Sequence, residues 1–246
     1  MLRLKLTAIP LLALLAAQPL LGQKPPSRAQ TLAEIQSRLL NAKVFERGEV
    51  QASYDNGVAT LTGTVESLGA KRDAERATRK VDEVMQVVNN IQVSTDDVSA
   101  RQILEEARKQ IVTYYAYGIF DNIALEAQGG KLIVTGQVSE PFKKGDIGNF
   151  LAHVRGVAEL ENNLEVLPTS IYDDQLRWAV ARAIYNDPYF IRYANRANPP
   201  IHIIVKNGNV TLEGVVGSAM DRAKAEQAAR FAATYFAFTN NLRVEG

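Results

Sequence analysis

The sequence predicts an α+β protein of three tandem two-layer domains, each ordered helix, strand, strand, helix, strand. The main observation is a repeat: a turn dipeptide, a glycine six residues after it and an asparagine doublet 26 residues after that glycine recur three times. Helical and then strand-type spacing of apolar residues accompany these landmarks in every copy. A register kept over three copies indicates a tandem array of one unit. The landmarks are Asn56-Gly57, Gly63 and Asn89-Asn90; Gly129-Gly130, Gly136 and Asn162-Asn163; and Asn207-Gly208, Gly214 and Asn240-Asn241.

Each unit begins with a predicted helix, because its apolar residues lie three or four apart, as one buried helix face requires. Paired carboxylates lie near the predicted helix starts, where negative charge favours the helix dipole, so they need no catalytic explanation. The three stripes are Leu32, Ile35 and Leu39; Ile103, Ala107 and Ile111; and Leu176, Val180 and Ile184.

Two strands follow around each turn dipeptide, since apolar and polar residues alternate on both sides of it. The turn glycines Gly57, Gly130 and Gly208 are expected to form the hairpin turns, where positive φ angles favour glycine. The second glycines, Gly63, Gly136 and Gly214, share the inward strand face. We expect a helix to cross closely at each, leaving no room for a side chain.

A second helix and a last strand complete each unit. Alanine-rich segments predict this helix over 70–84 in the first unit and 219–235 in the third. The second unit carries Pro141, Gly145 and Gly148 instead, so its second helix is expected to begin late, near Ile147. Two helices with one apolar stripe each can cover one face of a three-stranded sheet.

The boundaries follow from these elements. Residues 1–22 are typical of a cleaved export signal, with Arg3 and Lys5 before an apolar run, and an uncleaved N-terminal anchor is the alternative. Residues 23–30 are expected to form a linker. The three units are then residues 31–95, 99–168 and 171–246, called units one, two and three below. A periplasmic location follows from the signal.

Composition and motifs argue against several functions. Without the signal, the chain has 26 basic and 27 acidic residues, so a basic nucleic-acid coat protein is disfavoured. It has no cysteine, and its two histidines, His153 and His202, lack metal-ligand spacing and are expected to be surface or packing residues. The glycine pairs lie between strands instead of leading into a helix, which disfavours a phosphate loop. We therefore expect no metal, no cofactor, no small-molecule substrate and no enzymatic activity.

These landmarks, together with the segment from Val154 to Leu164, resemble the BON domain, named for bacterial osmotic-stress and nodulation proteins. The resemblance extends over three tandem copies and nearly all of the chain after the signal. It implies an exported binding module tied to stress tolerance and, in several members, to phospholipid surfaces or envelope partners. It implies no catalytic centre. One departure is Gly156, which is Glu83 in unit one and Thr234 in unit three, so the turn into the last strand is expected to differ.

Unit three departs most from its siblings and holds the candidate site. It has extra residues between its first helix and first strand, where aromatic residues and arginines alternate. In the helix before this insert, Trp178 lies opposite the apolar stripe. Aromatic rings beside arginines are typical of a membrane interface, but they are equally typical of a protein interface. The predicted lipid- or partner-binding residues are Trp178, Arg182, Tyr185, Tyr189, Phe190, Arg192, Tyr193 and Arg196.

The sequence therefore favours a non-catalytic envelope protein that contacts anionic phospholipid at a periplasmic membrane surface and supports envelope integrity under stress. The alternative is a module that binds another envelope protein or assembles with itself. In that case the aromatic residues of unit three pack against a neighbouring unit or subunit. A second aromatic group, Tyr114, Tyr115, Tyr117 and Phe120, is expected to belong mostly to the core of unit two.

Overall fold

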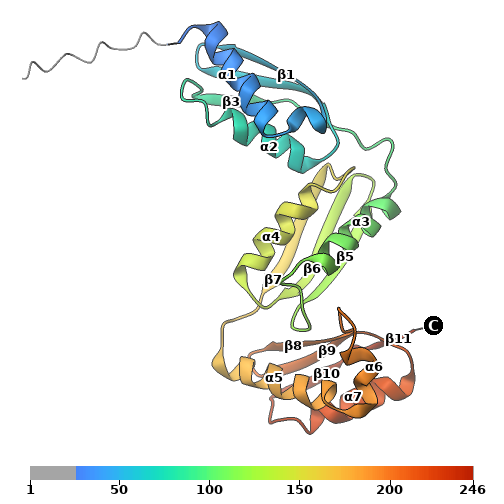
Figure 1. Ribbon diagram of the computed structural model, residues 1–246. Coiled ribbons are helices and arrows are strands. Elements are labelled where there is room, and N and C mark those ends of the chain that lie inside the picture. The colour runs from blue at the N-terminus through green and yellow to red at the C-terminus, as the bar shows by residue number, and fades with distance from the viewer. Residues whose placement is uncertain (1–25, 246) are drawn as a thin grey trace, which may run out of the picture.

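The computed structural model describes residues 26–245 of the chain, and the expected signal peptide lies outside the described residues. The described part forms three units that follow one another along the molecule (Figure 1). Unit one contains α1 (Arg28–Asn41), η1 (Val44–Glu46), β1 (Gly48–Asp55), β2 (Val58–Val65), α2 (Leu68–Thr78), β3 (Gln86–Asn89) and β4 (Gln92–Val93). Its first helix begins inside the expected linker, because Ser27 caps it together with Gln30.

Units two and three repeat this order. Unit two contains α3 (Ala100–Thr113), β5 (Asn122–Gln128), β6 (Lys131–Val138), α4 (Pro141–Ala152) and β7 (Glu159–Val166). Unit three contains α5 (Ile171–Tyr185), η2 (Pro188–Phe190), α6 (Ile191–Ala194), β8 (Ile201–Lys206), β9 (Asn209–Val216), α7 (Ala219–Arg230), β10 (Ala237–Asn240) and β11 (Arg243–Val244).

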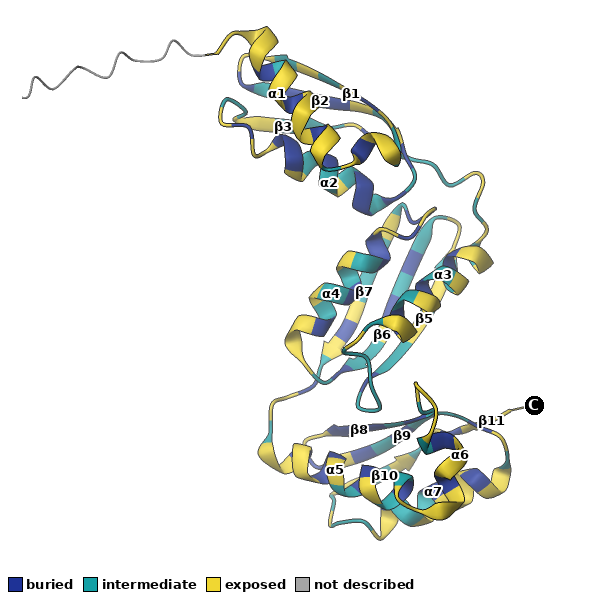
Figure 2. Cartoon of the chain, in the orientation of Figure 1, coloured by how far each residue is buried: buried dark blue, intermediate teal, exposed yellow. Residues whose placement is uncertain are grey.

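The sheets share one topology, in which the second strand of each unit lies between its neighbours. It pairs antiparallel with the first strand and parallel with the last. The two helices of a unit cover one face of its sheet (Figure 1), and their buried positions face that sheet (Figure 2). Unit two has the expected three strands, whereas the last strand is divided in units one and three, so those sheets have four.

Each unit has its own hydrophobic core, built on the predicted helix stripes. The stripes of α3 and α5 are buried as expected, while α1 buries Thr31 in place of the half-buried Leu32. The second and last strands supply the opposite side of each core. Representative core residues are Ile35, Leu61 and Ile91; Ile103, Leu132 and Leu164; and Val180, Leu212 and Leu242.

The first asparagine of each doublet joins the last strand to the second helix. The Asn89 side-chain amide donates to the Lys71 carbonyl at 3.0 Å, while its side-chain oxygen accepts from the Ile91 amide at 3.3 Å. Asn162 and Asn240 make the equivalent pair of bonds in the other units. The repeated asparagine is therefore structural, because it satisfies a helix carbonyl and a strand amide at the same place in all three units.

The sheet glycines have a different cause from the one the sequence indicated. The expected helix crossing is wrong, because a Cβ at Gly63, Gly136 or Gly214 would instead lie about 2 Å from a backbone carbonyl of the neighbouring strand (2.0, 2.0 and 1.9 Å). The same residues have φ angles of 120°, 115° and 120°. Both the close approach of the strands and the positive φ require glycine. The inward strand face was correctly predicted, but the crowding comes from the sheet.

The hairpin turns follow the predicted chemistry in the two units with an Asn-Gly pair. Both residues have positive φ there, at 46° and 85° in Asn56-Gly57 and at 52° and 75° in Asn207-Gly208, as a two-residue hairpin of this type requires. In unit two only Gly129 has a positive φ, at 58°. The turn of unit two lies against its neighbour, since a Cβ on Gly130 would meet Thr95.

The second helix of unit two begins earlier than expected. Helix α4 begins at Pro141 instead of near Ile147, so that prediction is wrong. Proline is favoured in the first helical turn because its missing N–H has no intrahelical partner there. The two glycines lie inside the helix, and Gly145 faces open space.

A buried polar position distinguishes the three second helices. Seven residues after the sheet glycine, unit one has Ala70, unit two Lys143 and unit three Asp221. The Lys143 ammonium donates to both carboxylate oxygens of Asp121 at 3.0 and 2.8 Å, and both residues are buried. Asp221 is fully buried and forms an ion pair with Arg192. Units two and three thus place ion pairs of opposite polarity where unit one packs a methyl group.

Candidate functional site

The insert of unit three forms η2 and α6, and it folds onto the core of its own unit. Phe190 and Tyr193 are 0% and 3% exposed, and their stacked rings lie with centroids 6.2 Å apart. Both belong to the core cluster of unit three. The sequence predicts both as lipid- or partner-binding residues, but the insert covers the edge of the core and buries both rings.

The arginines of the insert lie around a polar network that Asp221 and Tyr193 form. The Tyr193 hydroxyl donates to Asp221 at 2.9 Å, and the Gly217 amide donates to that hydroxyl at 2.7 Å. Arg192 forms the ion pair with Asp221 and lies 4.9 Å from the Tyr193 ring, while Arg196 lies 5.2 Å from that ring. Burial alone would raise the pKa of Asp221, but hydrogen bonds from its neighbours and the Arg192 charge outweigh it and lower that pKa.

The remaining predicted residues lie at the surface to different degrees. Trp178 is 54% exposed, and its indole packs edge-on against Phe120 of unit two, with the two ring centroids 5.0 Å apart. The Tyr185 hydroxyl bonds both the amide and the carbonyl of Ile201, and burial raises its pKa. Arg182 is exposed, and Tyr189 is 37% exposed with Lys224 lying 5.1 Å from its ring. The structure does not bring the predicted set together as one surface.

The junction between units two and three uses the second aromatic group. Tyr114 and Tyr117 pack against the core of unit two, but Phe120 packs against the core of unit three, and Tyr115 is 86% exposed. The segment 117–120 lies beside β8, where the Ile203 amide donates to the Ile119 carbonyl at 2.7 Å. Only part of this group therefore belongs to the core of unit two, because the chain after Tyr117 runs onto the next unit.

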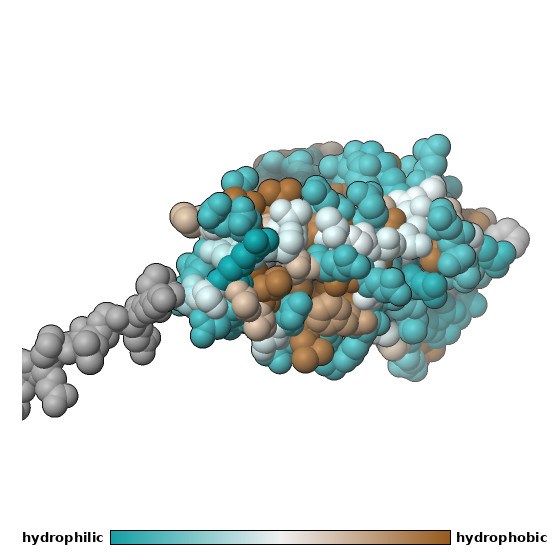
Figure 3. All heavy atoms as spheres, turned by 90° about the horizontal axis from the view of Figure 1, so that it is seen from above, coloured by the Kyte–Doolittle hydropathy of each residue, from teal (hydrophilic) through white to brown (hydrophobic). Residues whose placement is uncertain are grey.

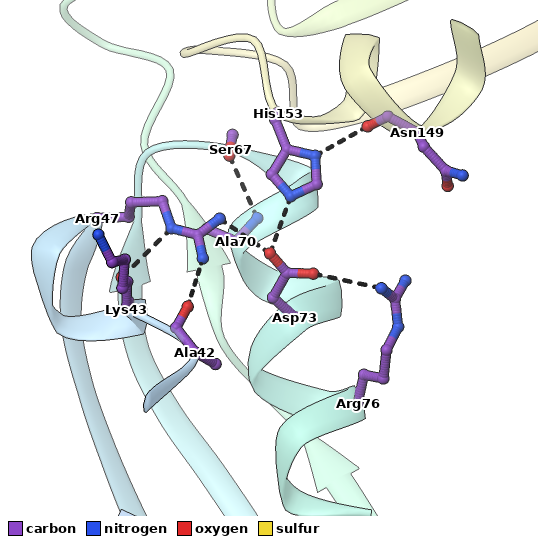
Figure 4. A network of polar contacts seen from close by, with 9 residues as sticks. All are labelled: Ala42, Lys43, Arg47, Ser67, Ala70, Asp73, Arg76, Asn149 and His153. Atoms are coloured by element: carbon purple, nitrogen blue, oxygen red, sulfur yellow. Dashed lines mark hydrogen bonds and ion pairs between the residues drawn. The ribbon is translucent and has the colours of Figure 1, made fainter. Parts of the chain in front are cut away.

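The junction between units one and two has a polar network centred on Asp73 (Figure 4). Asp73 accepts from Arg47 at 2.9 Å and from the Nε2 atom of His153, which belongs to unit two, at 2.9 Å. The other ring nitrogen of His153 lies 2.8 Å from the Asn149 carbonyl. Both ring nitrogens thus lie within hydrogen-bond distance of oxygen atoms from the two units. His153 is a packing residue of the junction, consistent with the sequence-based expectation.

Backbone bonds fix the same junction. The Leu68 amide donates to the Val157 carbonyl at 2.7 Å, and the Gly156 amide donates to the Glu66 carbonyl at 2.8 Å. Gly156 has a φ of 85°, which a side chain rarely adopts. In unit two the turn at Gly156 contacts unit one. The equivalent positions, Glu83 in unit one and Thr234 in unit three, carry side chains and make no such backbone bond in the described residues.

His153→Ala is expected to loosen the junction between units one and two. It removes a partly exposed hydrogen bond of about 1 kcal/mol. Because the chain has no cysteine, two introduced cysteines at Ser53 and Glu126 can carry spin labels for distance measurement. We expect a broader distance distribution in this variant than in Arg38→Ala, which removes an exposed ion pair with Glu34 inside unit one. Equal distributions would contradict the junction role of His153.

The same measurement has a defined pH dependence. Burial alone would raise the pKa of Asp73, but the bonds from His153 and Arg47 outweigh it and lower that pKa. A lowered pKa stabilises the junction fully above the unfolded value of about 3.9, and the contribution is lost as pH falls through the folded value. In the protein that keeps His153, the distance distribution is therefore expected to broaden as the pH falls below about 4.

An exposed aromatic surface that the sequence did not reveal lies at the far side of unit three. Phe231 and Phe236 are 85% and 81% exposed and bound the loop between α7 and β10. Tyr172 is 46% exposed, with its ring 6.4 Å from that of Phe236 and its hydroxyl bonded to the Thr234 carbonyl. We call Tyr172, Phe231 and Phe236 the aromatic loop surface.

Comparison of the three units could have found part of this surface. Phe236 occupies a repeated position, because Met85 in unit one and Ala158 in unit two also lie 22 residues after the sheet glycine and cover the hairpin turn. Met85 is 85% exposed, whereas Ala158 lies at the junction with unit one. The sequence obscured this position because its alanine-rich pattern predicts helix to residue 235, five residues beyond the end of α7.

Residues 26–245 hold no group of three or more histidine or acidic side chains arranged to bind a metal ion. Among the helices of this region, none combines the length and hydropathy needed to cross a membrane.

Comparison with solved structures gives low overall similarity. The C-terminal domain of CdsD, a structural protein of the type III secretion system of Chlamydia trachomatis, is 14% identical over 90% of this chain and 100% of that chain, with a TM-score of 0.26. The periplasmic domain of PrgH, a type III secretion inner membrane protein of S. typhimurium, is 12% identical over 85% of this chain and 100% of that chain, with a TM-score of 0.22. Both scores are too low to support any functional argument.

The curated proteins contain no significant match to this chain. The family comparison is informative, because the BON domain model matches residues 27–95 and residues 173–246. These segments coincide with units one and three, and together they cover more than half of the chain. The sheet glycine and the asparagine bonds described above lie in both segments. The protein therefore belongs to the BON domain family.

Proposed function

We propose that the protein is a non-catalytic binding protein of the bacterial envelope that docks another envelope protein. The aromatic loop surface carries this proposal, because Tyr172 and Phe236 are exposed side by side and Phe231 is exposed at the other end of the same loop. Exposed aromatic clusters of this kind are typical of the energetic centre of a protein interface. Export to the periplasm rests on the signal-like residues 1–22 and on the family resemblance.

The distribution of charge favours a protein partner over anionic lipid. Binding to an anionic membrane requires free cations near the inserted rings. Within the insert, Arg192 neutralises buried Asp221, and Arg196 lies over the Tyr193 ring. Beside the aromatic loop surface, Arg230 is paired with Glu226. The arginine beside the aromatic loop surface is therefore neutralised, whereas Arg196 and Lys224 keep their charge beside the rings of the insert.

Anionic phospholipid is the second candidate partner. The observation that favours it is the half-exposed Trp178 ring one helical turn from the exposed Arg182 on α5. A tryptophan beside an arginine suits the headgroup region of a membrane. Only this pair, together with Tyr189, retains the arrangement that the sequence indicated.

We also propose that unit two is a third BON domain. Its sheet glycine has the same φ and the same close strand contact as those of units one and three. Asn162 makes the same two hydrogen bonds as Asn89 and Asn240. Unit two would then act as a spacer, because its two ends are occupied by junctions with its neighbours.

Replacing Phe231 and Phe236 together by alanine is expected to weaken docking at least about tenfold, since exposed aromatic anchors contribute about 2 kcal/mol or more to an interface. A photo-crosslinking amino acid placed at either position in the full chain should give discrete protein adducts in living cells. The same amino acid at Phe142, which is 49% exposed on unit two, is the matched control.

Vesicle sedimentation distinguishes the two candidates. The full chain is mixed with vesicles containing phosphatidylglycerol, at low and at high salt. Protein adducts at positions 231 and 236 without vesicle binding support the proposal. Absence of adducts, together with salt-sensitive vesicle binding that Trp178→Ala abolishes, would overturn it in favour of lipid.

A further inference from the structure

The outer edge of β8 in unit three is largely occupied. Strand β8 is the first strand of its hairpin, so one side of its backbone has no strand partner. The Tyr185 hydroxyl bonds the amide and carbonyl of Ile201, the Ile119 carbonyl accepts from Ile203, and Arg177 donates to the Val205 carbonyl. The strand is nearly all buried (Figure 2). Side chains of α5 and one turn of unit two, which contributes the Ile119 carbonyl, thus cover this edge together.

The equivalent edge in unit one is largely open. The register relative to the sheet glycine makes Val50, Ala52 and Tyr54 of β1 equivalent to Ile201, Ile203 and Val205, because Val50 lies opposite Gly63 as Ile201 lies opposite Gly214. Arg28 donates to the Tyr54 carbonyl at 2.7 Å, so the backbone groups at this position of β1 point away from β2. In residues 26–245, no hydrogen bond from outside the hairpin reaches Val50 or Ala52. The outward backbone groups of Val50 and Ala52 are therefore available to bind a partner.

An apolar groove lies beside these two residues. It has a volume of ≈650 Å³ and runs between α1 and β1. Leu40 and Phe45, which are 64% and 42% exposed, lie on its wall, and Val50 and Ala52 form its floor. Unit one faces the viewer in Figure 3, where hydrophobic side chains gather between hydrophilic ones. In unit three the corresponding space between α5 and β8 receives Phe120, whose ring packs on Trp178.

We propose that the β1 edge and its groove bind a short segment of a partner protein, which accepts a hydrogen bond from the Ala52 amide and places side chains in the groove, as the turn at Ile119 does on unit three. The segment carries an aliphatic residue followed by an aromatic one, the pair that Ile119 and Phe120 present to unit three. Main-chain bonds to the edge supply affinity and the groove selects the side chains. An open edge strand beside exposed apolar side chains is otherwise an aggregation hazard, which an occupant removes. This inference rests on the proposed function as a binding protein and names the kind of partner.

The probe is a synthetic peptide that copies residues 116–122 of this chain, added to the full chain. We expect saturating peptide to slow hydrogen exchange at the Ala52 amide by about tenfold or more, which corresponds to a local stabilisation of about 1.4 kcal/mol. The Leu125 amide, at the equivalent position of the open β5 edge, should not change. A peptide with alanine in place of both Ile119 and Phe120 should have no effect, because it lacks the side chains that the groove selects.

Variants locate the site. Ala52→Pro removes the outward N–H at a position where an edge strand tolerates proline, and Leu40→Lys charges the groove wall. Both should weaken peptide binding about tenfold or more. Met85→Lys, a change at an 85% exposed residue of the same unit away from the groove, should leave binding unchanged.

Three outcomes would overturn the inference. The first is no protection at Ala52, and the second is protection at Leu125 in its place. The third is protection without peptide that rises with protein concentration, which would place a second copy of the chain on the edge. If these occur while crosslinks at Phe231 and Phe236 persist, only this inference fails and the proposed function stands.

Discussion

Gly136→Ala is expected to destabilise unit two by roughly 3 kcal/mol or more. The residue has a φ of 115°, and an added Cβ would lie 2.0 Å from the Asn122 carbonyl oxygen. Unfavourable φ alone costs roughly 1–3 kcal/mol, and the carbonyl belongs to a paired strand that cannot move without breaking the hairpin. Hydrogen exchange of the β6 amides measures this loss separately from the neighbouring units.

The matched control is Gly145→Ala in the same unit. Gly145 lies inside α4, its added Cβ would meet no atom within 4 Å, and its φ is not positive. Alanine is the better helix former, so this change should stabilise α4 by about 1 kcal/mol. Opposite signs for the two glycine-to-alanine changes are the expected result. A loss at Gly136 as small as the effect at Gly145 would show that the sheet can relax around a side chain.

Lys143→Met is expected to be the second large effect, with a loss of about 3–5 kcal/mol in the stability of unit two. Methionine keeps the length of the side chain but leaves the fully buried Asp121 carboxylate without its cation. Ser139 and the Gly118 amide still donate to Asp121, yet they supply no charge. The same exchange measurement on β6 reports the change.

Lys109→Met is the control for this substitution. Lys109 is exposed and pairs with Glu106 at 3.5 Å, a surface contact worth about 0–1 kcal/mol. A small effect of Lys109→Met beside a large effect of Lys143→Met would identify burial of the ion pair as the cause. Equal small effects would mean that the Asp121 carboxyl takes up a proton or reaches water when the lysine is removed.

Much of the fold could be predicted from the sequence, because it depends on local properties. The spacing of Ile103, Ala107 and Ile111 identifies a buried helix face without knowledge of its partner. The Asn-Gly turns follow from the φ angles of their own residues. Helix α4 was mispredicted because proline is harmful inside a helix but favourable at its start, and the position of that start depends on the end of β6.

The candidate site was less predictable, because burial depends on contacts between distant residues. Trp178 was correctly placed away from the core of its own unit, yet the sequence does not show that Phe120 packs on it. Phe190 and Tyr193 lie among arginines, as aromatic residues of an exposed interface do, and only their packing against the core of unit three buries them. The sequence predicts one lipid- or partner-binding role for all eight residues, whereas the structure buries some of them and exposes others.

The sequence by itself determined the repeat, the strand and helix order and the family, since these follow from turn chemistry and from the period of apolar residues. The tertiary structure alone decided how the copies differ in use. It covers the β8 edge with side chains of α5 and the Ile119 carbonyl of unit two and leaves most of the β1 edge open, although the two strands share one register. The reason is physical: a strand edge is satisfied by whichever chain lies beside it, and chain neighbours in space are not encoded in the local pattern of the strand.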